Sequence, residues 1–553
     1  VRSSIFMIKL DSIQSKAYTE ITQNLLTIQD PSKKQVKQEI IKICTKYSLD
    51  RIPKNYEILS MAKKSDFDKL KKVLMRKPAK TASGVSVVAL MPKPYACPHG
   101  RCTYCPGGIE FNSPNSYTGK EPSSLNAIAN KFDPKLQITS KIKKLIAFGH
   151  DPSKMEIVIV GGTFLFMPKD YQKDFIKSCY DALNGIDSKD LEEAKSNNEH
   201  AAIRNVGFTI ETKPDYCKKE HVDLMLSYGI TRVEIGVQSL QERVYKIVNR
   251  GHNYNDVIES FQISKDAGYK LVAHMMPGLP TMKPEEDIAD FKKLFSDPQL
   301  RPDMLKIYPS LVIENTPLYE EYKQGRYTPY SDEDMIKVLT EAKKNVPKWV
   351  RIMRVQREIT PGEIIAGPKA GNLRQIVHQN LAKQGLSCKC IRCREVGLSN
   401  KKSNGGEVKL DRINYDSSGG KEVFLSYEDR NELIYGFLRL RKPSIEAHRD
   451  EINQDTCIVR EIHVYGKSLK LGEKEEDEIQ HTGLGRKWMK EAEKISREEF
   501  DAKKLLVISA IGTREYYQKL GYSLYGQSMS KILNRWKNMS EEKIMVKEPG
   551  KEK

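Results

Sequence analysis

Three cysteines in one short segment could hold a metal centre with an open position. Cys97, Cys102 and Cys105 follow a C-x4-C-x2-C pattern in a segment rich in Pro and Gly. Three thiolates are one fewer than the four that complete a structural zinc or iron–sulfur site. The pattern matches a cubane cluster with three protein-bound irons, whose fourth iron is free to bind a small molecule. A zinc ion completed by His99 is the competing interpretation of this spacing.

A second group of cysteines lies much later in the chain. Cys388, Cys390 and Cys393 are separated by one and two residues. Three thiolates so close together favour a structural zinc ion with one further ligand, for which His378 is our candidate. A second iron–sulfur cluster is the alternative. It would indicate sulfur-insertion chemistry, so the identity of this metal separates two classes of reaction.

A glycine-rich segment at the start of a predicted helix is suited to bind a pyrophosphate. Its candidate binding residues are Gln480, Thr482, Gly483, Leu484 and Gly485. The unpaired backbone N–H groups and the positive dipole end of a helix attract anions. Gly485 would let the backbone approach such a ligand closely. A G-x-G pattern also occurs at ordinary helix starts, and that alternative stays open.

The elements that position the first cysteine group are short apolar runs that alternate with helical patterns. The runs cover residues 85–91, 155–160, 206–210, 232–237, 270–275, 305–311 and 350–356. Such alternation predicts βα units and a parallel sheet. Seven runs favour a full or partial (β/α) barrel over a small doubly wound sheet. We therefore expect the chemistry to gather where the strands end.

Polar or glycine residues follow these runs at the expected edge of the sheet. They include Gly161, Gly162, Thr163, Glu211, Lys213 and Gln238. Each of them alone would be ordinary turn chemistry. Because the carboxyl ends of parallel strands meet at one edge, we expect these residues to share a site with the first cysteine group.

The regions on either side of the barrel differ in character. Residues 1–80 hold 18 Lys and Arg against 8 Asp and Glu, and residues 33–47 and 65–74 have the pattern of basic amphipathic helices. A bundle with a solvated face is the simpler interpretation, but the imbalance favours a surface for a polyanion.

Residues 398–420 have the composition of a linker, and a hairpin, strands and helices are expected beyond them. We divide the chain into a basic helical segment (1–80), a barrel (81–360), a cysteine-containing zinc linker (361–420) and a C-terminal α/β domain (421–553).

The overall composition excludes several classes of protein. The 553 residues carry a formal net charge of +19 and are 39% hydrophobic, which is typical of a soluble globular chain of several domains. The longest strongly apolar stretch, residues 157–167, is too short for a membrane span. No secretory signal is recognisable. We therefore expect the clustered cysteines to be metal ligands in a reducing cytosol rather than disulfides.

The first cysteine loop resembles the cluster-binding loop of radical S-adenosylmethionine (SAM) enzymes, with the spacing of the Elongator catalytic subunit family and its stand-alone archaeal and bacterial members. The resemblance implies that Cys97, Cys102 and Cys105 hold a [4Fe–4S] cluster whose unique iron binds the amino and carboxylate groups of SAM. It also implies contacts with SAM at the strand ends, from Gly161, Gly162 and Thr163 beside the methionine amino group and from Glu211, Lys213 and Gln238 nearer the nucleoside and methionine parts.

The C-terminal region resembles the acetyl-CoA site of the GNAT acetyltransferases, with residues 480–485 on the pyrophosphate. A predicted strand precedes this segment, and Tyr516 and Tyr517 follow it. The resemblance implies that one of these tyrosines lies near the thioester, as a general acid toward the departing thiolate or as part of the pocket wall. An aromatic pair on a helix is otherwise most often core packing.

The order of these parts resembles the Elongator catalytic subunit family over nearly the whole chain. The implied fold is α/β: a radical SAM partial or full barrel with a basic helical segment before it and a GNAT domain after it. The implied function is a tRNA carboxymethyluridine synthase. In that scheme a SAM-derived 5′-deoxyadenosyl radical takes hydrogen from the methyl group of acetyl-CoA. The resulting carbon radical attacks carbon 5 of the wobble uridine, and thioester hydrolysis leaves a carboxymethyl group.

The same resemblance implies a cytoplasmic enzyme whose partners are the anticodon stem-loop of tRNA, acetyl-CoA and an unidentified electron donor. Self-association or a larger assembly is left open. One alternative is a protein lysine acetyltransferase with a structural iron–sulfur cluster, and another is a non-catalytic tRNA-binding scaffold whose acetyl-CoA pocket senses occupancy. A structural role does not explain an open three-cysteine site, so we favour the synthase.

Overall fold

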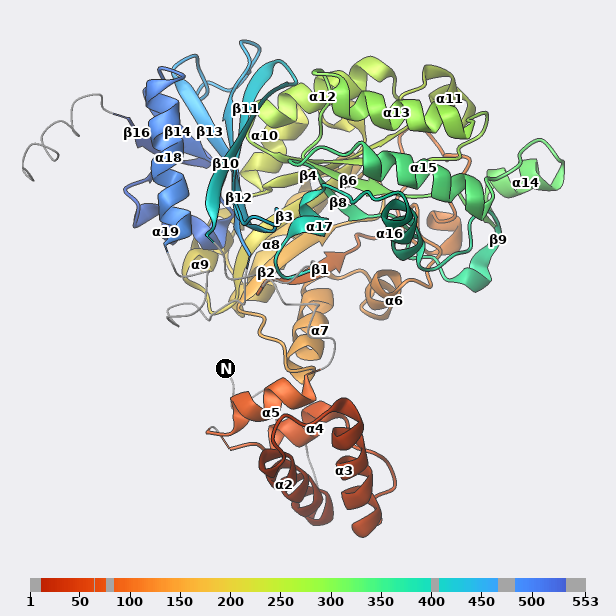
Figure 1. The fold of residues 1–553 in the computed structure, drawn as a ribbon, viewed down its shortest axis with the longest axis vertical. Coiled ribbons are helices and arrows are strands. Elements are labelled where there is room, and N and C mark those ends of the chain that lie inside the picture. The colour runs from red at the N-terminus through yellow and green to blue at the C-terminus, as the bar shows by residue number, and fades with distance from the viewer. Residues whose placement is uncertain (1–10, 64, 76–83, 399–406, 466–482, 534–553) are drawn as a thin grey trace, which may run out of the picture.

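A computed structural model describes residues 11–63, 65–75, 84–398, 407–465 and 483–533. A helical bundle comes first, followed by a unit built on a parallel sheet and a unit built on a mixed sheet (Figure 1). The bundle stands below the two sheet units in Figure 1, while those two units pack side by side. None of the helices in these ranges combines the length and apolar character that a membrane span requires.

The N-terminal bundle is built from amphipathic helices. They are α2 (Ser12–Thr27), α3 (Lys33–Lys46), α4 (Asn55–Ser60) and α5 (Phe67–Leu74). Side-chain caps fix the start of the two longer helices, because Asp11 accepts from the Gln14 N–H at 2.7 Å and Ser32 accepts from Gln35. The apolar face of α3 is buried in the bundle core while its lysines stay outside. The two basic helices expected from the sequence are thus confirmed.

The central unit is a parallel sheet of seven strands whose order in space follows the chain, β1-β2-β3-β4-β5-β6-β8. The strands are β1 (Ser86–Leu90), β2 (Lys154–Ile159), β3 (Arg204–Thr212), β4 (Arg232–Gln238), β5 (Lys270–Met275), β6 (Met304–Ile307) and β8 (Arg351–Arg354). All seven predicted runs are confirmed as strands. Within the described residues β1 and β8 do not pair, so the sheet is a curled partial barrel.

Helices cover the outer face of this sheet (Figure 1). The helices of this unit are α6 (Pro122–Ala129), α7 (Pro134–Ala147), α8 (Lys169–Asn184), α9 (Leu191–His200), α10 (Lys219–Ser227), α11 (Glu242–Ile247), α12 (Tyr254–Asp266), α13 (Pro284–Ser296), α14 (Pro317–Lys323), α15 (Asp332–Lys344), α16 (Leu373–Lys383) and α17 (Ile391–Arg394), of which α14 projects from the end of the unit instead of covering the sheet. A small separate ladder pairs β7 (Val312–Ile313) with β9 (Ile364–Ala366). Strand residues such as Ile157, Phe208 and Leu271 are fully buried under the helices. This burial explains why the strands read as apolar runs.

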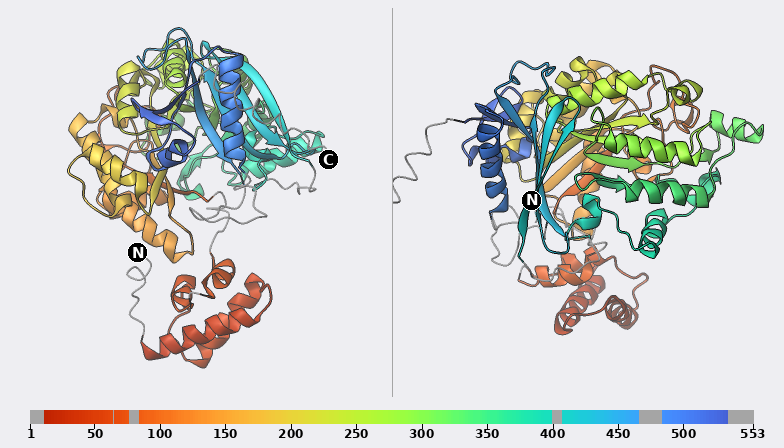
Figure 2. Two further views of the ribbon diagram at one scale, coloured as in Figure 1. Left: turned by 90° about the vertical axis from the view of Figure 1, so that its left-hand side faces the viewer. Right: turned by 45° about the horizontal axis from the view of Figure 1, so that its top comes forward.

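The C-terminal unit is a mixed sheet in the order β10-β11-β12-β13-β14-β16-β15. Its strands are β10 (Lys409–Ser417), β11 (Gly420–Glu428), β12 (Ile434–Lys442), β13 (Thr456–Val464), β14 (Lys504–Val507), β15 (Ser523–Tyr525) and β16 (Ser528–Ile532), and its helices are α18 (Leu484–Glu498) and α19 (Arg514–Gln518). Trp488 of α18 lies fully buried in a core on one face of the sheet. Figure 2 shows the sheet between α18 and the barrel. The expected α/β fold class is thereby confirmed.

The expectation of a linker over residues 398–420 is wrong for its second half. Lys409–Ser417 forms β10, which pairs with β11 in antiparallel register along its whole length. This strand lies at the edge of the sheet, and most of its side chains are exposed or half-buried. Charged and polar residues on an edge strand discourage further pairing. A charged and polar composition is also typical of linkers, which is why the sequence predicted a linker here.

A buried network of charges joins the C-terminal sheet to the barrel. Asp303, which precedes β6, accepts hydrogen bonds from two nitrogens of Arg460 on β13 at 2.6 and 2.7 Å, and Lys265 of α12 lies 3.9 Å away. Asp266 and Arg441 form a second buried pair at 2.6 Å. Burial alone would raise the pKa of Asp303, but Arg460 and Lys265 outweigh burial and hold that pKa well below its usual range. The two units are therefore locked together by buried ion pairs.

Candidate functional site

A cavity of about 340 Å³ opens where the strands of the parallel sheet end. The loop after β1 and the ends of β2, β3 and β4 form its wall. This wall brings together eight residues that the sequence placed in one site: Cys97, Cys102, Cys105, Gly162, Thr163, Glu211, Lys213 and Gln238. The topology explains the gathering, because all strands of a parallel sheet deliver their carboxyl ends to the same edge.

The glycine pair after β2 lets the loop that carries the cysteines pack closely against the end of this strand. Gly161 and Gly162 have φ angles of +110° and +103°, in the region that favours glycine. A Cβ on Gly161 would lie 2.8 Å from the Pro114 side chain, and one on Gly162 would lie 3.1 Å from Asn115. Gly161 does not itself line the cavity. Its part is to let the turn at Pro114 and Asn115 pack against the end of β2.

The spread of the first three cysteine sulfurs distinguishes between a single ion and a cluster. In the part of the chain that the structure describes, Cys97, Cys102 and Cys105 are not among the groups whose ligand atoms all lie within 4.8 Å of one another. A single zinc ion with Zn–S bonds of about 2.3 Å would bring the sulfurs to about 3.8 Å. In a [4Fe–4S] cluster each sulfur binds a different iron, which spreads the sulfurs. The three residues therefore fit a cluster better than a zinc ion.

Each of these sulfurs accepts a hydrogen bond from a different donor. Asn115 Nδ2 lies 3.0 Å from Cys97 Sγ, and the Ser116 N–H donates to Cys105 Sγ at 3.1 Å. His99 Nε2 lies 3.1 Å from Cys102 Sγ. Burial, together with the neighbouring Cys105 and Cys102, raises the pKa of Cys97 to about 11. Binding to iron would overcome this penalty, because coordination favours the thiolate.

A mostly buried group of charges borders the cavity, which Glu211 and His274 line. Glu211, Glu234 and His274 bring their ligand atoms within 4.8 Å of one another, which is a spacing that could suit a metal ion. Lys306 already supplies the cation, because its ammonium binds Glu234 and lies 3.6 Å from Glu211. Burial would lower the pKa of Lys306, but Glu234 outweighs it and raises that pKa. We conclude that this group fixes Glu211 at the cavity wall without a metal.

Several buried polar atoms at the wall lack a hydrogen-bond partner among the described residues. They are Gln238 Oε1, Tyr104 Oη and Arg250 Nε. Gln238 also has a φ angle of +72°, a left-handed conformation that is unusual for a residue at the end of a strand. Buried polar groups are nearly always satisfied in folded proteins. These atoms therefore point to a polar ligand in the cavity.

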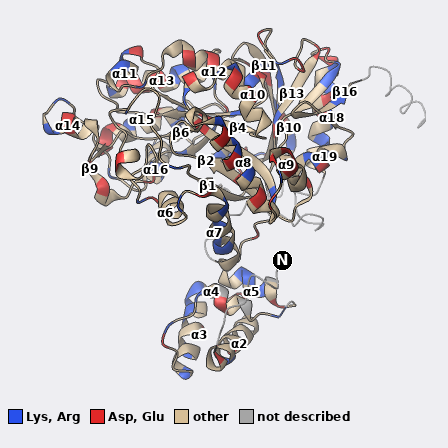
Figure 3. Cartoon of the chain, turned by 180° about the vertical axis from the view of Figure 1, so that it is seen from behind, with Lys and Arg blue, Asp and Glu red and all other residues tan. Residues whose placement is uncertain are grey.

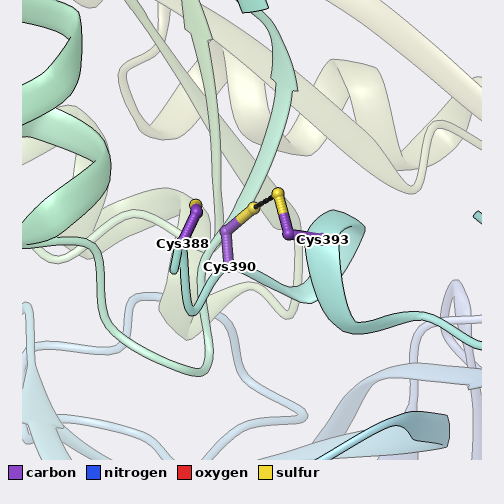
Figure 4. Close-up of side chains that lie close together, drawn as sticks. All are labelled: Cys388, Cys390 and Cys393. Carbon is purple, nitrogen blue, oxygen red and sulfur yellow. Dashed lines mark hydrogen bonds between the residues drawn. The ribbon is translucent and has the colours of Figure 1, made fainter. Parts of the chain in front are cut away.

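The second cysteine group has the compact geometry of a mononuclear site (Figure 4). The sulfurs of Cys388, Cys390 and Cys393 all lie within 4.8 Å of one another, and those of Cys390 and Cys393 are 3.4 Å apart. His378 of α16 lies with Nε2 3.5 Å from Cys393 Sγ. Its distances to the other sulfurs place it outside the compact group. The three sulfurs fit one ion, and His378 stays a predicted fourth ligand.

The glycine-rich segment of the C-terminal unit lies at the start of α18. Gly483 is the N-cap with a φ angle of +78°, and Leu484 and Gly485 open the helix, while Gln480 and Thr482 lie outside the described residues. The first turn contains no acidic residue but carries Arg486 and Lys487. Positive side chains oppose the dipole at a helix start unless an anion binds there. This arrangement therefore fits a phosphate ligand.

The structure separates the two candidate tyrosines. Tyr517 is 5% exposed and packs in the core that also holds Trp488, whereas Tyr516 is 40% exposed. A Cβ on Gly485 would lie 2.5 Å from Tyr516 Oη, so this tyrosine lies directly against the start of α18. Glu515, next to it, binds Arg204 of the barrel at 2.7 Å. Tyr516 is thus placed between the helix start and the interface with the barrel.

Residues that sequence reasoning missed come mainly from outside the motifs. Asn115 and Ser116 bind the cysteine sulfurs from a turn more than ten residues away from them. Arg250 lies 3.7 Å from Cys102 Sγ, although it follows α11 in the chain. Lys306 balances the carboxylates from β6, which lies two strands away from Glu234 on β4. No spacing in the sequence signals these contacts, because only the packed fold creates them.

Comparison with known proteins agrees with this geometry. The model of the radical SAM superfamily matches residues 91–294, and that of the radical SAM C-terminal domain matches residues 302–383. The model of the ELP3 N-terminal domain matches residues 14–82. A radical SAM domain implies a [4Fe–4S] cluster and SAM, which fits the spread of the cysteine sulfurs and the unpartnered polar atoms of the cavity.

Close relatives cover most of the chain. A tRNA uridine(34) acetyltransferase of Methanocaldococcus jannaschii is 46% identical over 491 residues, which are 87% of this chain and 90% of that protein. Elongator complex protein 3 of Homo sapiens is 44% identical over 503 residues, covering 89% of this chain and 92% of that protein. The solved structure of Methanocaldococcus infernus Elp3 with an N-terminal deletion is 43% identical, with a TM-score of 0.73, over 82% of this chain and all of that one. The chain therefore belongs to the radical SAM family that contains Elongator complex protein 3 and the archaeal tRNA uridine(34) acetyltransferases.

Proposed function

We propose that this protein carboxymethylates the wobble uridine of tRNA at carbon 5, using acetyl-CoA and a radical derived from SAM. The observation that carries the proposal is the cavity in which three widely spaced cysteine sulfurs meet the ends of three parallel strands. The names of the relatives, which act on tRNA uridine 34, support the choice of substrate. The first turn of α18, in the C-terminal unit, supports acetyl-CoA as the acyl donor.

In the barrel, the residues at the cavity wall would hold the cofactors. A bound [4Fe–4S] cluster would supply the electron that cleaves SAM to the 5′-deoxyadenosyl radical. Cys97, Cys102 and Cys105 would hold the cluster and leave one iron open for SAM. Gln238 offers a buried oxygen that has no protein partner, so it can accept a hydrogen bond from the ligand. Glu211 is fixed by Lys306 at 3.6 Å and offers a carboxylate at the same wall.

In the C-terminal unit, the start of α18 would bind the pyrophosphate of acetyl-CoA. Gly483 and Gly485 leave the backbone N–H groups accessible, and Arg486 adds a positive charge in the first turn. Tyr516 is the tyrosine that can reach the acyl end, because Tyr517 is buried in the core. The bond between Glu515 and Arg204 holds this region against the barrel in which the radical would form.

The N-terminal bundle would bind the tRNA backbone. Figure 3 shows Lys and Arg on α3, on α5 and on the neighbouring α7 of the barrel unit. The lysines of α3 are exposed, whereas its apolar face is buried. A surface of this kind recognises phosphates through charge and without base contacts.

We expect the basic face of α3 to set part of the salt dependence of tRNA binding. Replacing Lys34, Lys37 and Lys42 together by Gln should weaken binding and lower the slope of log affinity against log salt by roughly 0.7 for each phosphate that is no longer neutralised. Filter binding over a range of salt concentrations measures this slope. Binding of SAM and acetyl-CoA should not change. An unaltered slope, both in this variant and after removal of residues 1–80, would place the RNA elsewhere.

The function itself is tested by an anaerobic assay. The protein is reconstituted with iron and sulfide and incubated with SAM, acetyl-CoA, a low-potential reductant and tRNA. Nucleoside mass analysis should then show carboxymethyluridine, and 5′-deoxyadenosine should be released. Acetylated protein substrates without carboxymethyluridine would instead support a lysine acetyltransferase.

We further propose that Cys388, Cys390 and Cys393 hold a structural zinc ion. Metal analysis of the reconstituted protein should give about four irons and one zinc per chain. The compact spacing of these sulfurs is the reason, because it fits one ion. A Cys390→Ser variant should lose the zinc and keep the irons. A count near eight irons would mean a second cluster and would contradict the zinc site.

A further inference from the structure

Two side chains outside the cysteine motif form a chain of contacts that ends on a cysteine sulfur. Lys213, at the end of β3, places Nζ 2.9 Å from His99 Nδ1. The other ring nitrogen, His99 Nε2, lies 3.1 Å from Cys102 Sγ. Lys213 is 2% exposed and Cys102 is 6% exposed, while His99 between them is half-buried at the cavity wall.

The chemistry of the lysine determines which nitrogen of His99 carries the proton. An ammonium group only donates hydrogen bonds, so Nδ1 must accept from Lys213. In a neutral imidazole the proton then lies on Nε2, which donates it to Cys102 Sγ. Burial and Arg250 lower the pKa of Lys213, whereas Asp215, 3.2 Å from Lys213 Nζ, opposes that shift and favours the charged ammonium. Because both ring nitrogens are engaged, His99 has no lone pair for a metal, which argues against its role as a zinc ligand.

The surrounding backbone holds His99 in this position. A Cβ on Gly251 would lie 2.4 Å from the His99 Cβ, so only glycine lets the two segments pack this closely. Asn249 Nδ2 donates to the His99 carbonyl and to the Arg101 carbonyl, both at 3.1 Å. The segment after α11 therefore fixes the loop that carries the histidine.

Cys102 differs from the other two cysteines in the charge that it faces. Cys97 and Cys105 accept from the neutral amides of Asn115 and Ser116. Cys102 faces the Lys213–His99 pair and also Arg250, whose Nη1 lies 3.7 Å away. Among the contacts that the three sulfurs accept, those at Cys102 are thus the ones connected to cationic side chains.

We propose that Lys213 and His99 are a positioning pair that raises the reduction potential of a [4Fe–4S] cluster held through Cys102. Hydrogen bonds and positive charge near the sulfurs stabilise the reduced cluster, which carries one more negative charge. One electron enters from a low-potential donor, no bond is broken, and the proton of His99 stays on Nε2. The inference rests on the radical SAM site of the proposed function but not on the identity of its RNA or acyl substrate.

The test is a redox titration of the reconstituted protein without SAM, acetyl-CoA or tRNA, followed by electron paramagnetic resonance. In His99→Leu, reduction should become at least about tenfold less favourable, which equals a potential lower by about 59 mV for one electron. His99→Gln should stay near the wild type, because an amide can accept from Lys213 and donate to Cys102. The reduction potential of Lys213→Met should lie between those of the two His99 variants. His200→Leu, at an exposed histidine beside Glu515, serves as the control without a shift.

The outcomes separate this inference from the proposed function. A His99→Leu protein with about four irons and the wild-type potential would overturn the inference and leave the function standing. Loss of iron from both His99 variants would make the histidine a ligand and also overturn it. If His99→Leu does not fold, an unchanged potential in Lys213→Met overturns it instead. A wild-type chain that takes up no [4Fe–4S] cluster would refute the proposed function itself.

Discussion

In a Cys102→Ala variant, formation of 5′-deoxyadenosine from SAM falls below detection, while acetyl-CoA still binds. The variant keeps two of the three thiolates at the cavity, which cannot hold three irons of a cluster. The start of α18 belongs to a different unit with its own buried core, so its ligand should be unaffected. Chromatography of the reaction measures the first quantity, and calorimetry with acetyl-CoA measures the second.

The matched control for this variant is Cys217→Ala. Cys217 is fully buried beside Ser264 and lies outside both cysteine groups. Its replacement removes a similar side chain from the same unit, so SAM cleavage should persist if the protein folds. Carboxymethyluridine formed by Cys102→Ala would show that the radical mechanism is wrong. Loss of acetyl-CoA binding in that variant would show that the two sites depend on one another.

An Asp303→Asn variant should be about 3–5 kcal/mol less stable than the wild type. Asp303 is fully buried and faces Arg460 at 2.6 Å, Arg439 at 3.7 Å and Lys265 at 3.9 Å. The amide keeps the volume of the side chain but removes the negative charge. The buried cations around it then lose part of the negative charge that balances them. Urea unfolding of both proteins, followed by circular dichroism, measures the difference in their free energies of unfolding. We also expect the C-terminal unit to become accessible to proteases earlier than in the wild type.

The pH dependence of this difference follows from the depressed pKa of Asp303. Its carboxyl is held below its ordinary pKa by Arg460 and Lys265 despite the opposing effect of burial. A carboxyl whose pKa is lower in the folded state contributes stability above its unfolded value of about 4 and loses it as the pH falls further. The gap between the wild type and the variant should therefore shrink below pH ~4. Asp187→Asn, at an exposed pair with Lys135, should show a much smaller gap throughout. If Asp187→Asn lost as much free energy of unfolding as Asp303→Asn, burial of the ion pair could not be the cause of the large effect.

Much of the barrel could be predicted because its central strands, β4, β5 and β6, are buried on both faces. Each apolar run, such as residues 270–275, sits in the sheet as expected, since a covered parallel strand requires continuous apolar sequence. The shared edge followed from the topology, and with it the meeting of Glu211 and Gln238 with the cysteines. These parts of the site depend on local sequence and on one general rule about parallel sheets.

Other features depend on contacts between distant segments. The pair of Asp303 and Arg460 joins residues 157 positions apart, and neither has a neighbour that reveals the partner. The proton position on His99 depends on Lys213, which lies 114 residues further along the chain. The strand β10 escaped prediction because an edge strand with polar side chains has the composition of a linker. Burial and long-range pairing, which sequence patterns do not encode directly, decide these features.

Among the residues that the structure describes, β1 and β8 do not pair with each other, and this seam is a line of mechanical weakness in the barrel. Across this seam, Arg357 donates to the Ser116 carbonyl at 2.9 Å and Lys120 lies 3.6 Å from Glu363. An exposed ion pair contributes at most about 1 kcal/mol, whereas separating two paired strands breaks several backbone hydrogen bonds. Elastic deformation of the barrel should therefore concentrate at the seam. Because the Ser116 N–H also donates to Cys105 Sγ, any force that widens the seam is transmitted as tension to a sulfur of the first cysteine group.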